Sequence, residues 1–284
     1  MNVTFEDATN RITDVKYQNL PDYPKPFSNA TFGSFKGRSL IMGGDYGSNA
    51  CFEFDRDEWQ AIPYINVNRF WAASTFIQYK IVVAGGYGTL AHSDNIEILD
   101  WDESNHGTQW IQSPSRLPIE VHSHTLVTLN NKLYLIGGRD SYNKFSRVWR
   151  QFVGIYGNMD KIWEGTFNKE DNKISWVEME LRLQKKRSRH FSIVISNQII
   201  IFGGYVEGED VVEILIENKL KQGPKVPFKL STEYDQAVLD RKNRIIITSR
   251  HYGLIVYDHK EGAFQSFPNF KLREERKGYA AILQ

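Results

Sequence analysis

Short runs of consecutive apolar residues recur along the chain, and four of them end in a pair of glycines. The pairs are Gly43-Gly44, Gly85-Gly86, Gly137-Gly138 and Gly203-Gly204, while a fifth run, residues 244–249, ends without glycine. Each run is apolar at successive rather than alternate positions, which is typical of strands that are covered on both faces. The pattern therefore predicts five buried strands, four of which lead into a sharp turn.

The spacing of these runs predicts a repeat architecture. Successive pairs are 42, 52 and 66 residues apart, and 45 more residues separate the fourth pair from Thr248. Sheet repeats near 50 residues bury their faces against neighbouring copies, as the blades of a β-propeller do. Paired glycines suit a turn near a crowded axis, because Gly takes positive φ without a steric cost. We expect an all-β propeller.

Further features follow each run in a fixed order. After Gly44 come Phe54-Asp55, a polar turn and Trp59, and the fifth repeat shows Tyr257-Asp258 followed by Phe264. The order of Gly-Gly, an aromatic or aliphatic residue before Asp, and then Trp or Phe resembles the kelch motif. The resemblance covers residues 27–272, which we predict to be the full repeats.

Two repeats depart from this order. The third carries extra residues between Asp140 and Ile162, which predict either a long loop or an added strand. The fourth lacks the outer Trp, and we expect its two outer strands at residues 211–216 and 226–228.

The two ends of the chain look like parts of one blade. Residues 4–13 align without gaps on residues 166–175, so the chain begins in an outer pair of strands, and residues 278–284 look like an inner strand. Pairing these ends would close the ring and remove exposed strand edges. We predict a single propeller domain, residues 1–284, with six blades, the sixth built from residues 1–23 and 278–284. Five full blades is the alternative.

Composition excludes several classes of function. Lys and Arg number 35 and Asp and Glu 34, so no overall charge favours nucleic acid or anionic membrane. The single cysteine, Cys51, excludes an internal disulfide and is expected to be a small core residue. No secretory leader is evident at the amino terminus, and no apolar stretch approaches 18 residues. We expect a cytoplasmic, monomeric protein with no cofactor and no nucleic-acid or membrane partner.

The most plausible functional surface is the mouth of the central channel. In a propeller, the turns after the glycine pairs and the connections into the inner strands lie on one face around that mouth. Tyr, Trp and Arg are enriched at binding hot spots. The predicted partner-binding residues on this face are Tyr46, Arg69, Trp71, Tyr87, His122, Arg139, Tyr142, Arg187, Arg189, Tyr205, Tyr234, Arg250, Tyr252 and Arg276. The alternative is that the tyrosines only cover the channel rim.

Two more specific motifs, a basic run and a pair of histidines, give weaker evidence of function. The basic run at residues 185–190 is interpreted as a solvated connection, with a localisation signal or a phosphate contact as alternatives. His122 and His124 could ligate a metal, but no Cys, Asp or Glu stands at a matching interval, which favours a structural role. We predict no metal site and no catalytic residue.

Some proteins similar to the kelch family are enzymes or depend on a metal. The copper radical oxidases need a cysteine cross-linked to a tyrosine at the channel, a role that Cys51 does not fit. The iron-dependent specifier proteins use a Glu, an Asp and a His spaced four apart, which this chain lacks. A sugar epimerase of the kelch-propeller type would need acid and base groups at the mouth, and Glu207, Asp140, His122 and His251 are candidates.

We therefore favour a non-enzymatic module that binds a partner protein or peptide across the channel face. A small-molecule enzyme at the channel mouth is the alternative. Only residues 1–26 precede the first full repeat. We expect no amino-terminal oligomerisation domain there of the kind that kelch receptors of ubiquitin ligases carry.

Overall fold

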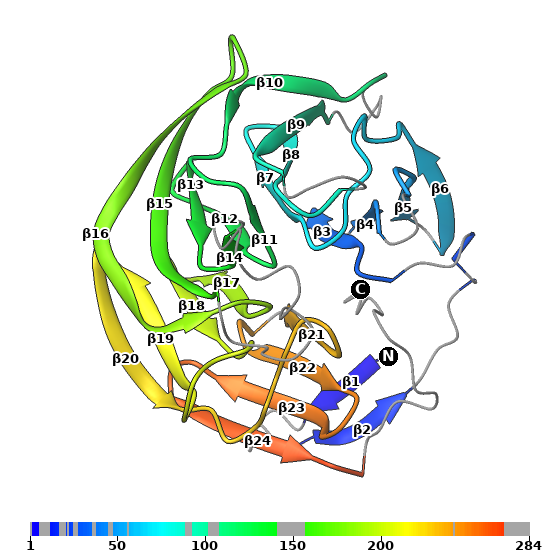
Figure 1. Cartoon of the computed structure of the whole chain (residues 1–284). Coiled ribbons are helices and arrows are strands. Elements are labelled where there is room, and N and C mark those ends of the chain that lie inside the picture. The colour runs from blue at the N-terminus through cyan, green and yellow to red at the C-terminus, as the bar shows by residue number, and fades with distance from the viewer. Residues whose placement is uncertain are drawn as a thin grey trace, which may run out of the picture.

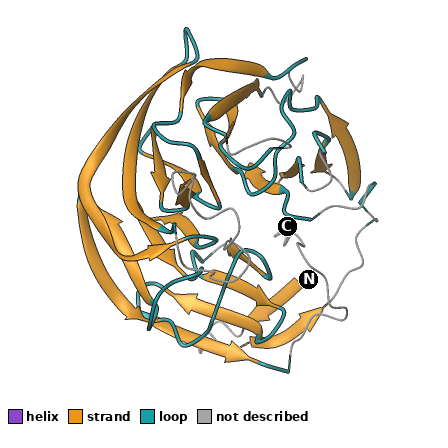
Figure 2. Cartoon of the chain, in the orientation of Figure 1, coloured by secondary structure: helices purple, strands orange, loops and turns teal. Residues whose placement is uncertain are grey.

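The protein is a ring of antiparallel β-sheets. The computed structural model describes residues 2–5, 12–16, 21, 23–24, 28–35, 38–44, 48–55, 57–88, 93–101, 108–140, 157–240 and 242–269. Within these residues the regular elements are all strands (Figure 2), and none of the described segments forms a helix that could cross a membrane. Five sheets of four strands each stand around a central channel as the blades of a propeller (Figure 1).

Each blade runs from an inner strand at the channel to an outer strand at the periphery, and its neighbours in the sheet are hydrogen-bonded in that order. Blade 1 contains β3 (Thr31–Phe35), β4 (Arg38–Met42), β5 (Cys51–Asp55) and β6 (Glu58–Ile62). Blade 2 contains β7 (Ala73–Ile77), β8 (Lys80–Ala84), β9 (Asn95–Asp100) and β10 (Ile111–Arg116). Blade 3 contains β12 (Thr125–Leu129), β13 (Lys132–Ile136), β15 (Met159–Asn168) and β16 (Lys173–Arg187).

The last two blades keep the same order. Blade 4 contains β17 (Phe191–Ile195), β18 (Gln198–Phe202), β19 (Val211–Ile216) and β20 (Lys219–Lys225). Blade 5 contains β21 (Asp235–Leu239), β22 (Ile245–Ser249), β23 (Gly253–Asp258) and β24 (Ala263–Phe267).

The predicted apolar runs are the second strands of the blades, and they are buried on both faces. Ile199, Ile200 and Ile201 of β18 are all 0 % exposed. The apolar clusters cross from blade to blade: one packs β8 against β13, and another packs β18 against β22. Burial of each such side chain contributes about 1.5–3 kcal/mol. The hydrophobic core thus lies in the seams between blades.

The glycine pairs lie at these seams, where their backbone forms hydrogen bonds across the seam. Every one of the eight glycines has positive φ. The N–H of Gly86 donates to the carbonyl of Val121, and that of Gly138 to the carbonyl of Arg187, each bond 2.9 Å long and each reaching the start of the segment that connects to the next blade. A Cβ on Gly137 would lie 2.8 Å from the Arg187 carbonyl oxygen. The predicted need for glycine at a crowded turn is confirmed.

The fifth repeat makes its turn without a glycine pair. Ser249 of β22 pairs directly with Gly253 of β23, so the two strands form a tight hairpin. The Ser249 hydroxyl accepts hydrogen bonds from the backbone N–H groups of His251 and Tyr252. The positive φ that the other repeats take at the glycine pair is taken here by Gly253, at +77°.

A short antiparallel pair lies outside the five blades. Strand β1 (Asn2–Phe5) pairs with β2 (Ile12–Lys16), with Phe5 opposite Ile12. The aligned pair occurs in blade 3, where Phe167 lies opposite Ile174. In Figure 1 this pair lies in the arc between blade 5 and blade 1. The other predicted part of a sixth blade, residues 278–284, falls outside the described residues, so that blade stays a prediction.

One of the expected outer segments is placed differently by the structure. The outer strand of blade 4 is β20 at Lys219–Lys225 rather than residues 226–228, because Glu217 and Asn218 take positive φ and turn the chain straight back from β19. Val226, just beyond β20, packs into the core between blades 4 and 5. In blade 3 a short strand, β14 (Arg139–Asp140), pairs with β11 (Val121–His122) just before the predicted extra segment. Residues 141–156 of that segment fall outside the described residues, so the choice between a long loop and an added strand stays open there.

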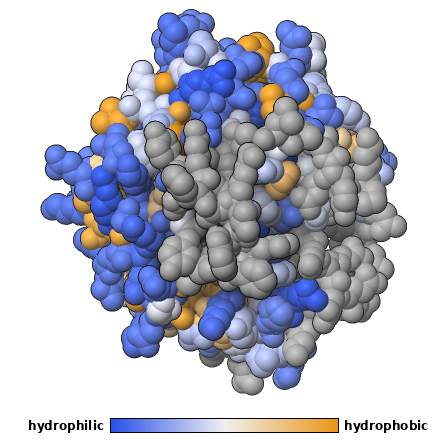
Figure 3. Space-filling view, viewed as in Figure 1, coloured by the Kyte–Doolittle hydropathy of each residue, from blue (hydrophilic) through white to orange (hydrophobic). Residues whose placement is uncertain are grey.

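The outer strand of blade 3 is unusually long and reaches both neighbouring blades. Near its start, the Ser113 hydroxyl of β10 donates to the carbonyl of Asn172, and the N–H of Ile174 donates to the Ser115 hydroxyl. Further along, β16 contacts β20. The basic run is therefore not a solvated connection throughout, because residues 185–187 end β16 and Arg187 is buried. The outer surface beside β16 and β20 is mostly hydrophilic (Figure 3).

Candidate functional site at the channel mouth

A belt of backbone hydrogen bonds surrounds the mouth of the channel. The N–H of Trp71 donates to the carbonyl of Asn29, Ser123 to Trp71, Arg189 to Ser123 and Thr232 to Arg189, over 2.8–3.0 Å. Each donor belongs to the connection into one blade and each acceptor to that of the blade before. The first four residues of this belt take positive φ between 52° and 56°. The backbone of these residues is therefore held in a defined position at the channel.

The belt surrounds the opening of a cavity of about 270 Å³. Residues of the belt and of the inner strands of all five blades line it, among them Trp71, Arg189 and Glu233 at the mouth and Ser74 and Ser192 deeper in the channel. This volume is enough for one or two side chains of a ligand, and its wall carries both apolar and hydroxyl groups.

Trp71 lies at the centre of a cluster of aromatic and cationic groups. The His122 ring stacks on it, with ring centroids 5.3 Å apart, and the Arg189 guanidinium carbon lies 4.6 Å from its ring centroid. Tyr87 meets His122 edge to face. Three blades thus contribute to one cluster, because Trp71 and Tyr87 belong to blade 2, His122 to blade 3 and Arg189 to blade 4. Within this cluster His122 is buried.

The cluster continues through Tyr205 of blade 4. Arg139 and Arg189 each lie over the Tyr205 ring, 5.7 and 5.4 Å from its centroid. The Tyr205 hydroxyl and the Arg189 guanidinium both donate to the carboxylate of Glu233 in blade 5. Arg139 is positioned by Asn158, whose Oδ1 accepts a hydrogen bond from Nε of Arg139 over 3.1 Å. Burial, and then the nearby Arg189 charge, lower the pKa of Arg139.

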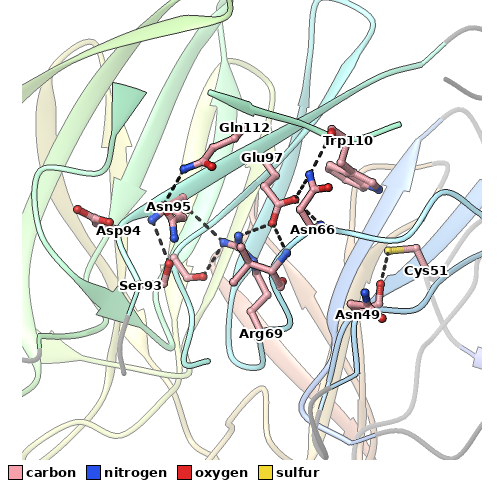
Figure 4. Close-up of polar contacts among 12 residues, drawn as sticks. Asn49, Cys51, Asn66, Arg69, Ser93, Asp94, Asn95, Glu97, Trp110 and Gln112 are labelled. Atoms are coloured by element: carbon pink, nitrogen blue, oxygen red, sulfur yellow. Dashed lines mark hydrogen bonds and ion pairs between the residues drawn. The ribbon is translucent and has the colours of Figure 1, made fainter. Parts of the chain in front are cut away.

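Two of the predicted contact residues are structural instead. Arg69 and Arg187 have 0 % exposed side chains, and each forms an ion pair with a buried glutamate, Arg69 with Glu97 at 2.5 Å and Arg187 with Glu213 at 2.8 Å. Figure 4 shows Arg69 reaching inward to Glu97, to which the amide groups of Asn66 also point. Direct contact of Arg69 and Arg187 with a partner was a wrong expectation, because both are enclosed within the protein.

The sequence contains a signal for these buried pairs. Glu97 stands between Ile96 and Ile98 in β9, and Glu213 stands between Val212 and Ile214 in β19. A carboxylate within a fully buried strand needs a cationic partner and hydrogen bonds, because burying an isolated charge is very costly. Those two glutamates predict two buried cations.

The predicted residues of blade 5 form a separate group on the rim. The His251 ring meets Tyr234 and Tyr252 edge to face, with centroids 6.0 and 6.3 Å apart. Arg250 begins the same hairpin turn and is partly exposed. The predicted residues Tyr46, Tyr142 and Arg276 lie outside the described residues.

The candidate catalytic groups are not gathered into one site. Asp140 lies in β14, His122 contacts the Ser123 hydroxyl, Glu207 is exposed beyond β18, and His251 lies on the blade 5 rim. Burial raises the pKa of Asp210 and Asp235, but neither carboxylate lines the cavity. Among the described residues no group of three His, Cys, Asp or Glu side chains is arranged to hold a metal.

The remaining sequence candidates belong to the core. Cys51 is 0 % exposed, as predicted, and burial raises the pKa of its thiol to about 12. His124 lies in the seam between blades 2 and 3, close to Gly85 and Gly138. Burial lowers the pKa of its imidazole to about 3, with a further contribution from Arg69.

Comparison with known proteins agrees with this architecture. The kelch motif matches residues 121–150, which begin at β11 and contain the third glycine pair. The chain is a kelch-type β-propeller. The matched segment contains the two inner strands of blade 3, β12 and β13, and the glycine pair that follows them, and this arrangement is repeated in blades 1, 2 and 4. A comparison with curated protein sequences found no match.

Proposed function

We propose that this kelch propeller binds a segment of a partner protein across its channel mouth. The observation that carries this proposal is one cluster of contacting side chains from three blades, Trp71, His122, Arg139, Arg189 and Tyr205, of which Trp71 and Arg189 line the cavity. Large aromatic and guanidinium groups supply contact area together with directional hydrogen bonds, which is the composition of binding hot spots. A rim of this kind suits a peptide or loop better than a small substrate that needs paired acids and bases.

Capture of partners from a lysate of the cells that make the protein, followed by affinity measurement with the purified partner, tests this function. The test variant carries Arg139→Ala and Tyr205→Ala. Its matched control carries Arg116→Ala and Tyr79→Ala, which change the same residue types at exposed positions of blade 2. Circular dichroism establishes that both variants are folded.

We expect the mouth variant to lose at least tenfold in affinity for the purified partner, because each lost hot-spot residue typically costs 1 kcal/mol or more, on the order of the 1.4 kcal/mol that equals a factor of ten. The control variant should bind as the wild type does. Equal binding by wild type and mouth variant would place the interaction elsewhere on the propeller. If no protein is retained, the channel-mouth enzyme becomes the better hypothesis.

A further inference from the structure

Glu233 makes a contact at the channel mouth that joins two blades. Its carboxylate accepts hydrogen bonds from the Arg189 guanidinium and the Tyr205 hydroxyl, both of blade 4, while Glu233 itself belongs to the turn that leads into blade 5. The Glu233 side chain is 21 % exposed, and Glu233 and Arg189 both line the cavity. A ligand that enters the cavity therefore meets this ion pair directly.

The groups around Glu233 form a site for a carboxylate. A guanidinium and a phenol hydroxyl donate to the same carboxylate oxygen, Oε2. Charge-assisted bonds of this kind are the stronger hydrogen bonds of proteins. A second guanidinium, that of Arg139, lies over the same Tyr205 ring, and the Arg189 charge disfavours its protonated form. Negative charge at this place reduces the repulsion between the two arginines.

The carboxylates of the seams are bound differently from that of Glu233. Glu97 accepts hydrogen bonds from the backbone N–H groups of Asn66 and Val67 in addition to Arg69, and its side chain is 1 % exposed. The Glu233 carboxylate is bound by two side chains of a neighbouring blade and reaches the solvent. An incoming carboxylate can therefore replace Glu233 without unfolding a seam, whereas it could not replace Glu97.

We propose that Glu233 is an internal ligand, and that an aspartate or glutamate side chain of the partner takes its place on Arg189 and Tyr205 when the partner binds. This proposal rests on the proposed function and adds the chemistry of the partner, an acidic protein segment. In the free protein the Glu233 carboxylate competes with that segment and weakens its binding.

The test uses three pools of nine-residue peptides with random flanks and a fixed central residue: glutamate, glutamine or phosphoserine. The dissociation constant of each pool is measured at physiological salt for the wild type and for Glu233→Gln. The matched control is Glu207→Gln, which removes the same charge from an exposed residue two positions after Tyr205. The Arg139→Ala, Tyr205→Ala variant is measured in parallel, and thermal unfolding establishes that all proteins are folded.

We expect Glu233→Gln to bind the glutamate pool about tenfold more tightly than the wild type, because the charged carboxylate that competes for Arg189 and Tyr205 is removed. The glutamine pool and the Glu207→Gln control should show no such gain. An unchanged or weaker glutamate affinity, no binding of that pool at all, or a larger gain for phosphoserine would each overturn the proposal. If Glu233→Gln has no effect but the Arg139→Ala, Tyr205→Ala variant binds the pools more weakly, the mouth remains a binding site and only the role of Glu233 fails. If the Arg139→Ala, Tyr205→Ala variant also binds the pools as the wild type does, the proposed function fails as well.

Discussion

Arg187 and Arg189 stand two residues apart, yet they belong to two regions with different roles. Arg187 lies in the seam between blades, where its guanidinium contacts Asp210 and Glu213 and the solvent reaches none of it. Arg189 lies at the channel mouth, where it covers the Trp71 ring and lines the cavity. The backbone of Arg189 joins the belt around the channel, so its side chain is held at the opening.

The difference teaches that residue type alone does not identify a binding residue in this fold. In the seam, an arginine neutralises a buried glutamate and binds backbone carbonyl groups, as Arg69 does with Gly85 and Asn95. At the mouth, an arginine contacts aromatic and carboxylate side chains that a ligand can also reach.

The largest effect is expected from Glu97→Ala. Removing this carboxylate leaves Arg69 buried without its ion partner, which should lower the free energy of unfolding by about 3–5 kcal/mol. Asp94→Ala in the same blade breaks an exposed pair with Arg116 and should cost about 1 kcal/mol or less. Urea unfolding of both variants measures the difference. Equal losses would show that the seam pair contributes no more than a surface pair.

A smaller effect is expected from adding a methyl group to a glycine pair. Gly137 and Gly262 have similar φ, +56° and +64°, but a Cβ at Gly137 meets the Arg187 carbonyl and the His190 ring, while one at Gly262 meets nothing within 4 Å. Gly262→Ala should cost about 1–2 kcal/mol from its backbone conformation alone. Gly137→Ala should cost about 1–3 kcal/mol more, since it overpacks the seam. Losses of the same size in denaturant unfolding would mean that the seam relaxes around the methyl group.

The seam also predicts a dependence on pH. The pKa of His124 is about 3 in the folded protein, and burial lowers that of His190 as well, whereas an unfolded histidine titrates near 6.5. Below that value the unfolded chain binds more protons than the folded one, so stability falls as pH decreases from about 6.5 toward 3. The slope is about 1.4 kcal/mol per pH unit for each such histidine.

Replacing the buried imidazole measures this contribution. His124→Gln should flatten the fall in unfolding free energy between about pH 6 and pH 4, when unfolding curves are recorded at several pH values. His251→Gln, which changes an exposed histidine on the blade 5 rim, is the control and should leave the slope unchanged. If both variants keep the wild-type slope, His124 does not remain neutral in the folded seam.

The sequence was sufficient to predict the propeller, since the apolar runs and glycine pairs are local signals of buried strands and crowded turns. It also placed Trp71, His122, Arg139, Arg189 and Tyr205 on one face, where the structure brings them together. The burial of Arg187 could not be read from its own position, because it depends on Glu213, 26 residues further along the chain. The role of Glu233 was missed for the same reason, since its partners lie in another blade.

The turn chemistry of the outer strands was also difficult to predict. The apolar residues 226–228 look more like a strand than the lysine-rich residues 219–225 do. The positive φ of Glu217 and Asn218 determines where β20 begins. Neither residue is a glycine, so the sequence does not indicate this turn. Tertiary packing then places Val226 in the core between blades 4 and 5.

Hydrogen–deuterium exchange of the propeller with and without its captured partner tests the central distinction between seam and mouth most directly. We predict slower exchange on binding in the segments that carry the mouth, namely residues 70–71, 122–123, 188–190, 204–205 and 231–234, with no change in the buried strands β8 and β18 of the seams or in the outer strands β16 and β20. Protection confined to β16 and β20, with exchange at the mouth unaltered, would contradict the account and move the binding surface to the periphery of the ring.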